Sequence, residues 1–277
     1  MWKIWLFYEE EIMNILVCIK TVPDVTDARI DPETNNLIRD GIKTIINPSD
    51  LCGLKFALNL KEQVNEEVKI SALTMGPPSA EKYLRDCIAM GADEVYLLEG
   101  IEFKGSDTLA TSYALSEAAK AIGDFDIIFT GDQTMDGDTG QVGPQLAESL
   151  NMNQVTYISK IDYLDGHYEV KRETKGGTET LKLDTPFVAT CLKDSVGKPS
   201  KFALGRTKIA KTQEINHFTA QSLNLDPNRI GQNGSKTIVN EVYAPPKSQT
   251  GQMIDEGSLD KNIDVVIELL KKEHILV

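Results

Sequence analysis

Residues 125–150 read FDIIFTGDQTMDGDTGQVGPQLAESL. An apolar run, Phe125–Phe129, leads into a loop rich in glycine and aspartate, and a helix-like segment, Gln145–Leu150, leads out of it. A short apolar run bounded by turn residues is typical of a buried strand. Because proline is tolerated only in the first turn of a helix, Pro144 predicts a helix that begins near Gly143. The stretch therefore predicts a strand, a loop and a helix in succession.

The same alternation precedes this stretch, from Met13 onward. Ser49 and Ser79 are predicted to cap two helices, and Gly91 is predicted to end the second. Alternating strands and helices indicate an α/β fold, with a mostly parallel sheet covered by helices on both faces. The carboxyl ends of such strands share one edge, outside which ligands bind. The predicted strands span 14–19, 68–76, 93–99 and 125–130, and the predicted helices span 49–64, 79–91 and 107–123.

The pattern changes after about residue 153. Polar and apolar residues alternate from there through Leu192, interrupted at Asp165-Gly166 and Gly176-Gly177, which predicts an antiparallel hairpin attached to the sheet. From about Lys198 the chain is polar, and a final helix is predicted at 259–274. So little apolar material cannot form a core, which predicts a loose tail or an extended arm stabilised by another subunit.

Composition excludes several classes of function. The 277 residues carry a net charge of −13, which argues against binding to nucleic acid or to an anionic membrane. The amino-terminal segment MWKIWLFYEEEI is too short in apolar residues for a secretory signal, and no stretch approaches a membrane span. We therefore expect a cytoplasmic protein without membrane insertion. Four scattered cysteines predict buried thiols in a reducing compartment, and three isolated histidines predict no metal site.

The loop itself predicts a phosphate site. Glycines at Gly131, Gly137, Gly140 and Gly143 allow positive φ and a close approach of the backbone to a ligand. The helix that follows offers free N–H groups and the positive end of its dipole. Asp136 and Asp138 would repel a phosphate, so they are predicted to cap turns or to accept hydrogen bonds from ribose hydroxyls.

The sequence of the loop argues against several other kinds of binding loop. It has neither the Gly-Lys-Ser/Thr of a P-loop nor the GxGxxG order of a dinucleotide fold, and it lacks the distal glutamate of a calcium loop. A purely structural glycine-rich turn stays open. At the level of the whole protein, a single-chain nucleotide sensor of the universal-stress type would need neither the hairpin nor the arm. An adenylating enzyme would show a Ser-Gly-Gly loop after the first strand, where this chain has CIKTVPD.

Five motifs in register resemble the β subunit of electron-transfer flavoproteins. The similarity runs from about Met13 to about Leu204 and continues more weakly through the arm. One departure is Lys175, where the family usually has an acidic residue. The motifs are ILVCIKTVPD (15–24), INPSD (46–50), AMGADEVYLL (89–98), GDQTMDGDTGQVGP (131–144) and GGTETLKLDTPFVATC (176–191).

The resemblance implies a heterodimer with an α subunit that holds FAD, and electron exchange with a flavin-dependent dehydrogenase, acyl-CoA dehydrogenase-like or other. The β site would hold AMP in a simple carrier, or FAD that accepts hydride from NADH in a bifurcating member. Small residues at Gly137 and Gly140 favour FAD and bifurcation. Cofactor chemistry of this kind needs no catalytic residue from the chain, and Cys18 is the nearest candidate for one.

The resemblance also implies a set of site residues and a division of the chain. Leu204, within SKFALGRTKI, matches the anchoring position of the partner-recognition loop. The division is an extension (1–12), a nucleotide-binding α/β domain (13–203), and the recognition loop with the arm (204–277). The implied nucleotide contacts are Cys18, Asn47, Pro48, Ser49, Asp50, Met75, Gln133, Thr134, Met135, Asp136, Gly137, Asp138, Thr139, Gly140, Gln141, Val142 and Gly143.

Overall fold

A nine-stranded sheet forms the centre of the protein. The structure is a computed structural model that describes residues 12–24, 29–30, 37–38, 43–200, 204–238, 251 and 253–276. The strand order is β11-β10-β9-β12-β8-β1-β6-β7-β13, and the pairs from β9 through β13 are parallel. The strands of this parallel part are β1 (Ile12–Cys18), β6 (Glu67–Met75), β7 (Glu94–Leu98), β8 (Ile127–Gly131), β9 (Asn153–Leu164), β12 (Phe187–Cys191) and β13 (Asn216–Phe218).

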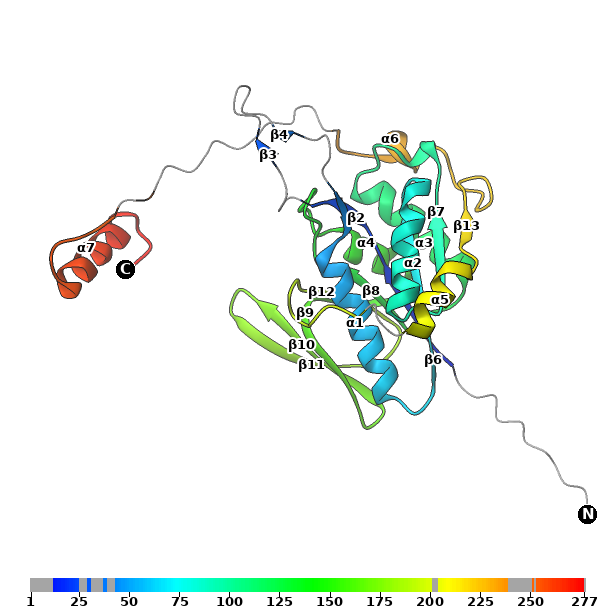
Figure 1. Ribbon diagram of the computed structural model, residues 1–277, viewed down its shortest axis with the longest axis horizontal. Coiled ribbons are helices and arrows are strands. Elements are labelled where there is room, and N and C mark those ends of the chain that lie inside the picture. The colour runs from blue at the N-terminus through cyan, green and yellow to red at the C-terminus, as the bar shows by residue number, and fades with distance from the viewer. Residues whose placement is uncertain are drawn as a thin grey trace, which may run out of the picture.

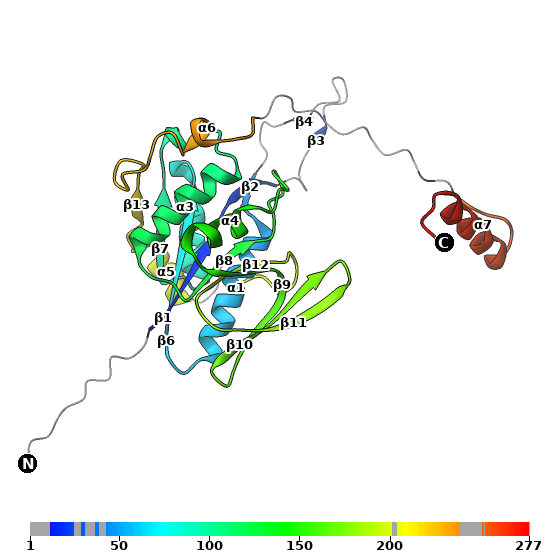
Figure 2. The same ribbon diagram turned by 180° about the vertical axis from the view of Figure 1, so that it is seen from behind.

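Helices cover both faces of this sheet, as predicted (Figures 1 and 2). On one face α1 (Pro48–Gln63) and α2 (Glu81–Met90) pack on the larger apolar core. On the other face α3 (Thr108–Ile122) and α4 (Val142–Leu150) pack on the smaller core. Central strands such as β8, which is buried on both faces, therefore read as continuous apolar runs.

The helix ends correct two of the predicted caps. Ser49 lies inside α1, because Pro48 occupies the first turn and Asn47 is the N-cap. Ser79 lies in a 3₁₀ turn, η2 (Pro78–Ala80), and α2 begins only after it. The predicted stop is confirmed, since Gly91 ends α2 with φ 138° and donates its N–H to Cys87 and Ile88.

The predicted antiparallel hairpin is confirmed and extended. Strands β9, β10 (His167–Thr174) and β11 (Gly177–Leu183) form an antiparallel meander, and Asp165 and Gly166 both adopt positive φ in its first turn. Strand β12, which the polar–apolar pattern grouped with this hairpin, instead inserts between β8 and β9 as a fully buried parallel strand. Its five buried residues make it a central strand and not an edge strand.

The polar segment after residue 198 is not uniformly loose. Helix α5 (Leu204–Thr212) packs on α2, β13 extends the sheet beyond β7, and Leu225 and Ile230 are buried in the smaller core next to α3 and the short α6 (Gly231–Gly234). These few apolar side chains add to an existing core and do not build a new one. By contrast α7 (Leu259–Lys272) buries no residue and lies apart from the α/β body in both views (Figures 1 and 2).

Short elements complete the described chain. Strand β2 (Thr21–Pro23) pairs with β5 (Thr44–Ile46), β3 (Arg29–Ile30) pairs with β4 (Leu37–Ile38), and η3 (Ile101–Phe103) precedes α3. All four cysteines are buried, as predicted, and none of them forms a disulfide within the described residues. No helix in the described part of the chain is long and apolar enough to span a membrane. Apart from Ile12, the predicted extension lies outside the described residues.

Candidate functional site

The carboxyl edge of the sheet brings together the residues predicted to bind a nucleotide. Cys18 ends β1, Met75 ends β6, and Gly131 ends β8. Residues 47–50 form the beginning of α1, and the glycine-rich loop 132–141 connects β8 to α4. The parallel order of the strands thus places segments more than a hundred residues apart in the sequence at one edge.

Asp50 lies at the centre of this edge and is buried. Its Oδ2 accepts the backbone N–H of Lys20 at 2.7 Å, and its Oδ1 accepts the N–H of Gly131 at 3.0 Å. Asn47 donates its side-chain amide to Asp50 Oδ1 at 3.0 Å and to the Gln133 carbonyl at 2.9 Å. One carboxylate therefore connects the segment after β1, the end of β8 and the first turn of α1.

Burial dominates the ionisation of two groups at this edge, Asp50 and Cys18. It raises the pKa of Asp50 to about 7, although the hydrogen bonds from Asn47, Lys20 and Gly131 act in the opposite direction. Burial also raises the pKa of the Cys18 thiol to about 12, with a smaller contribution from the Asp50 charge. Since the thiolate is the nucleophilic form, Cys18 is a packing residue and not a reactive thiol.

Two glycines at this edge are needed for close packing. A Cβ on Gly131 would lie 2.3 Å from Asp50 Oδ1, and a Cβ on Gly143 would lie 2.4 Å from the Thr190 methyl carbon. Neither glycine has positive φ. Gly131 allows β8 to approach the start of α1, and Gly143 allows α4 to approach β12.

Of the four loop glycines, Gly140 alone adopts positive φ, at 65°. A Cβ there would lie 3.1 Å from the Asp132 carbonyl. Gly131, Gly137 and Gly143 do not adopt the positive φ that glycine allows, and the chain instead enters the left-handed region at Asp138, with φ 54°. An aspartate tolerates the left-handed region better than most residues, which explains its position there.

Asp136 is held by a residue that the sequence reasoning missed. Its Oδ1 accepts the Lys20 ammonium at 2.8 Å, and the same ammonium lies 3.5 Å from Thr134 Oγ1. Partial burial opposes ionisation of Asp136, but the hydrogen bond and charge of Lys20 outweigh it and lower the pKa of that carboxyl. The sequence did offer a signal for this residue. Lys20 follows the first predicted strand directly, which places it at the same edge of the sheet as the loop.

Two buried polar atoms at the carboxyl edge have no hydrogen-bond partner among the described residues. They are Asp132 Oδ1, directly after β8, and Thr74 Oγ1, next to the end of β6. Buried polar atoms are normally paired, so each needs a partner. The carboxylate of Asp132 accepts from a hydroxyl or amino group but repels a phosphate, which fits the nucleoside part of a nucleotide. Asp132 is therefore a second candidate that sequence reasoning missed.

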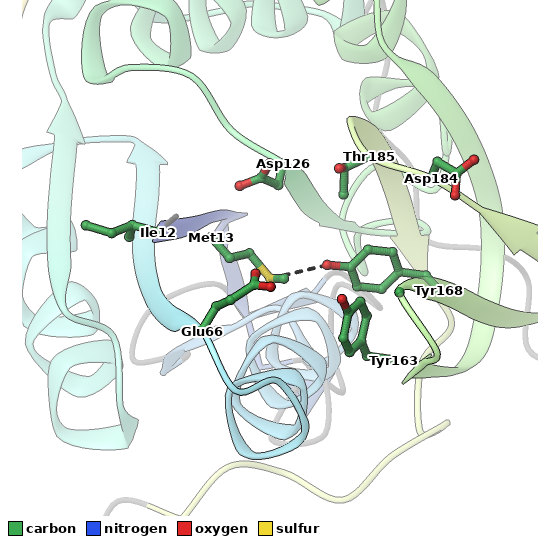
Figure 3. A pocket seen from close by; sticks show the side chains of 9 residues that line it. Ile12, Met13, Glu66, Asp126, Tyr163, Tyr168, Asp184 and Thr185 are labelled. Atoms are coloured by element: carbon green, nitrogen blue, oxygen red, sulfur yellow. Dashed lines mark hydrogen bonds between the residues drawn. The ribbon is translucent and has the colours of Figure 1, made fainter. Parts of the chain in front are cut away.

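Neither of the two cavities described for this chain coincides with the glycine loop. One, of about 490 Å³, lies at the opposite, amino-terminal edge, where Tyr168 donates its hydroxyl to the Met13 sulfur at 3.3 Å and Asp126 and Glu66 contribute carboxylates (Figure 3). The other, of about 680 Å³, lies beside α1 and α2 and reaches the loop only at Met135. Gly137 is exposed and Gly140 half-buried at the carboxyl edge, whereas Gly143 is buried.

The fold and the residues at the carboxyl edge of its sheet define a class of protein. It is the class of parallel α/β proteins that bind ligands beyond the carboxyl ends of their strands. Comparison with known families gives a narrower assignment. The model of the electron transfer flavoprotein domain matches residues 34–223. The chain belongs to the electron transfer flavoprotein family, and within it to the β subunits. Members of this family bind flavin or adenine nucleotides, and their β subunits pair with α subunits.

Three relatives illustrate the range of this family. The chain is 38% identical to the caffeyl-CoA reductase-Etf complex subunit CarD of Acetobacterium woodii, over 95% of this chain and 100% of the relative. It is 39% identical to the electron transfer flavoprotein subunit beta of Thermoanaerobacterium thermosaccharolyticum, with the same coverage. It is 40% identical to Protein FixA of Azorhizobium caulinodans, over 94% of this chain and 95% of the relative.

Proposed function

We propose that the β site of this subunit holds FAD, that this flavin accepts hydride from NADH, and that the complex bifurcates electrons. The observation that carries the proposal is Gly140, which has φ 65° and adds no side chain of its own at the carboxyl edge, where its Cβ position lies 3.8 Å from the Tyr157 hydroxyl. Such a site accommodates a ligand longer than AMP. In support, the relative in Acetobacterium woodii is named as a subunit of a caffeyl-CoA reductase-Etf complex.

In this proposal the residues of the chain bind and orient the nucleotide. FAD, when bound, supplies the hydride-accepting chemistry. Backbone N–H groups from Thr139 to Gly143 would hold the pyrophosphate at the start of α4, whose dipole favours a negative charge there. Asp132 and Thr74 would pair with the nucleoside. Asp50 keeps the three segments of the edge in register through its hydrogen bonds.

The contact with the α subunit is proposed to involve α7. Its apolar residues Leu259, Ile263, Val266 and Ile267 recur at helical spacing and are all exposed, whereas the other side of the helix carries charge. An amphipathic helix with no buried residue gains stability by burying that face on a partner. A cytoplasmic location is proposed for the complex.

A flavin-dependent dehydrogenase is the proposed exchange partner, with Leu204 as the docking residue. Leu204 is the first residue of α5, and its side chain lies outside the described part of the structure. The helix is held on the body by Arg206, which donates to the Ala92 carbonyl at 3.1 Å and to Asp93 Oδ1 at 3.3 Å. This end of α5 is therefore fixed relative to the sheet.

Counting flavins tests the proposal directly. The purified heterodimer with its α subunit is denatured, and the released flavin is measured against protein. FAD in both subunits gives two flavins per heterodimer, and NADH bleaches the flavin absorbance. One flavin together with bound AMP would show a simple carrier, in which the loop glycines serve only the turn. No flavin at all would point to a nucleotide sensor.

A further inference from the structure

Strand β9 contains a bulge directly beside the glycine loop. Its register with β12 runs from Val155 opposite Ala189 to Ile158 opposite Cys191, so that two residues of β9 face the single residue Thr190. Tyr157 is one of the two, and its φ of 57° lies in the left-handed region. A bulky residue with positive φ is an outlier, and bulges between parallel strands are rare. Such a feature persists only where the surrounding structure holds it.

Thr190 holds this bulge and connects it to α4. Its Oγ1 accepts the backbone N–H of Tyr157 at 2.9 Å, and the residue is 3% exposed. The methyl carbon of Thr190 packs against Gly143, and a Cβ added to Gly143 would lie 2.4 Å from that carbon. The first turn of α4, Thr190 and the bulge are thus packed as one unit, so that the position of Tyr157 is tied to the helix start that follows the loop.

The bulge directs the Tyr157 side chain toward the loop. A Cβ on Gly140 would lie 3.8 Å from the Tyr157 hydroxyl, and the side chain is 43% exposed at this open edge. The neighbouring residue Ile158 is fully buried in the core. Within the described part of the chain, the only hydrogen bond between Tyr157 and a side chain is the one from its backbone N–H to Thr190, and its hydroxyl forms none.

We propose that Tyr157 is a ligand contact of the nucleotide site and donates its hydroxyl to a phosphate held above Gly140. The proposal rests on the proposed function and deepens it, since it names the phosphate as the group of the nucleotide that Tyr157 contacts. A phosphate oxygen accepts a hydroxyl proton and carries charge, which makes such a hydrogen bond stronger than a neutral one. The backbone of Tyr157 is already held by its hydrogen bond to Thr190, so binding needs to order only the phenol side chain.

The substitution Tyr157→Phe tests this, because it removes the hydroxyl and keeps the ring. Nucleotide-stripped heterodimer is titrated with AMP and with adenosine by calorimetry. We expect the variant to bind AMP about 10-fold more weakly, the size of one hydrogen bond to a charged group, and to bind adenosine as the wild type does. Tyr163→Phe on the same strand is the matched control, because Tyr163 lines the cavity at the opposite edge of the sheet (Figure 3).

Different outcomes would contradict the Tyr157 contact and the nucleotide site on which it depends. Equal AMP binding by wild type and Tyr157→Phe overturns the phosphate contact while the nucleotide site stands. Equal weakening for AMP and adenosine also overturns it, because the hydroxyl would then support the loop or the nucleoside. A wild-type heterodimer that binds neither ligand refutes the nucleotide site itself. Unchanged melting temperature in both variants is required for each comparison.

Discussion

The Asp50 carboxylate accepts the backbone N–H of Gly131 at 3.0 Å and thereby joins the first turn of α1 to the end of β8. The two residues are 81 positions apart in the chain and both lie at the carboxyl edge of the sheet. A Cβ at position 131 would lie 2.3 Å from the same carboxylate oxygen, so this contact exists only because residue 131 is glycine.

Gly131→Ala is expected to separate β8 from α1. The added methyl group must displace buried Asp50, and overpacking of this kind costs about 1–3 kcal/mol. We expect a lower free energy of unfolding in urea and a loss of bound nucleotide from the heterodimer. Gly176→Ala is the control, since a Cβ there would meet its nearest neighbour only at 4.0 Å. Equal behaviour of the two variants would show that the close approach is unimportant.

Asp50 should make stability depend on pH. Its pKa is raised in the folded protein from 3.8 to about 7, so between these values the folded state binds more protons than the unfolded state. The free energy of unfolding of the wild type should therefore decrease as pH rises from about 4 to about 7, relative to Asp50→Asn, which cannot titrate. Urea denaturation of both proteins across this range measures the difference. Parallel pH profiles would contradict the prediction.

Gly140→Asn should change which nucleotide is bound. Asparagine tolerates the φ of 65°, so the loop keeps its course while a side chain is added beside the Tyr157 hydroxyl, 3.8 Å from the Cβ position. We expect flavin released per heterodimer to fall from two toward one, with AMP taking the vacated site. Asp138→Asn in the same loop adds no bulk and should keep both flavins. Two flavins in Gly140→Asn would show that the space above Gly140 is not used by the cofactor.

Ile263→Gln should weaken the association with the α subunit. Ile263 is 46% exposed on the apolar side of α7, and burying this exposed half on a partner is worth up to about 1.4 kcal/mol. We expect an affinity for the α subunit about 10-fold lower, measured by calorimetry or sedimentation, and no change in the stability of the α/β domain. Lys261→Gln on the charged side is the matched control. Loss of affinity in the control alone would place the contact on the charged face.

Leu204→Ala should slow electron exchange with the dehydrogenase. A buried apolar anchor at an interface contributes about 2 kcal/mol, which corresponds to a rate about 30-fold lower at limiting dehydrogenase. Flavin content and melting temperature should be unchanged. Ile209→Ala on the same helix, 49% exposed, is the control and should transfer electrons normally. A lower melting temperature for Leu204→Ala would instead identify an ordinary core leucine.

Local patterns in the sequence were sufficient for the main elements and for the edge of the sheet at which the predicted site residues meet. Apolar runs such as Phe125–Phe129 identify strands because a strand buried on both faces has no polar face to display. Gly91 and the Asp165-Gly166 turn are recognisable because positive φ is a local property of the backbone. The alternation of strands and helices then predicts the carboxyl edge, since right-handed crossovers leave parallel strands pointing in one direction.

Only the tertiary structure decided which distant residues meet at that edge. Strand β12 has the composition of any buried strand, and its place between β8 and β9 depends on packing across the whole sheet. The Lys20–Asp136 pair and the bulge at Tyr157 arise from partners 116 and 33 residues away, respectively. Hydrogen bonds and close packing act through space, so a residue's neighbours along the chain determine its conformation, whereas its partners depend on the folded sheet.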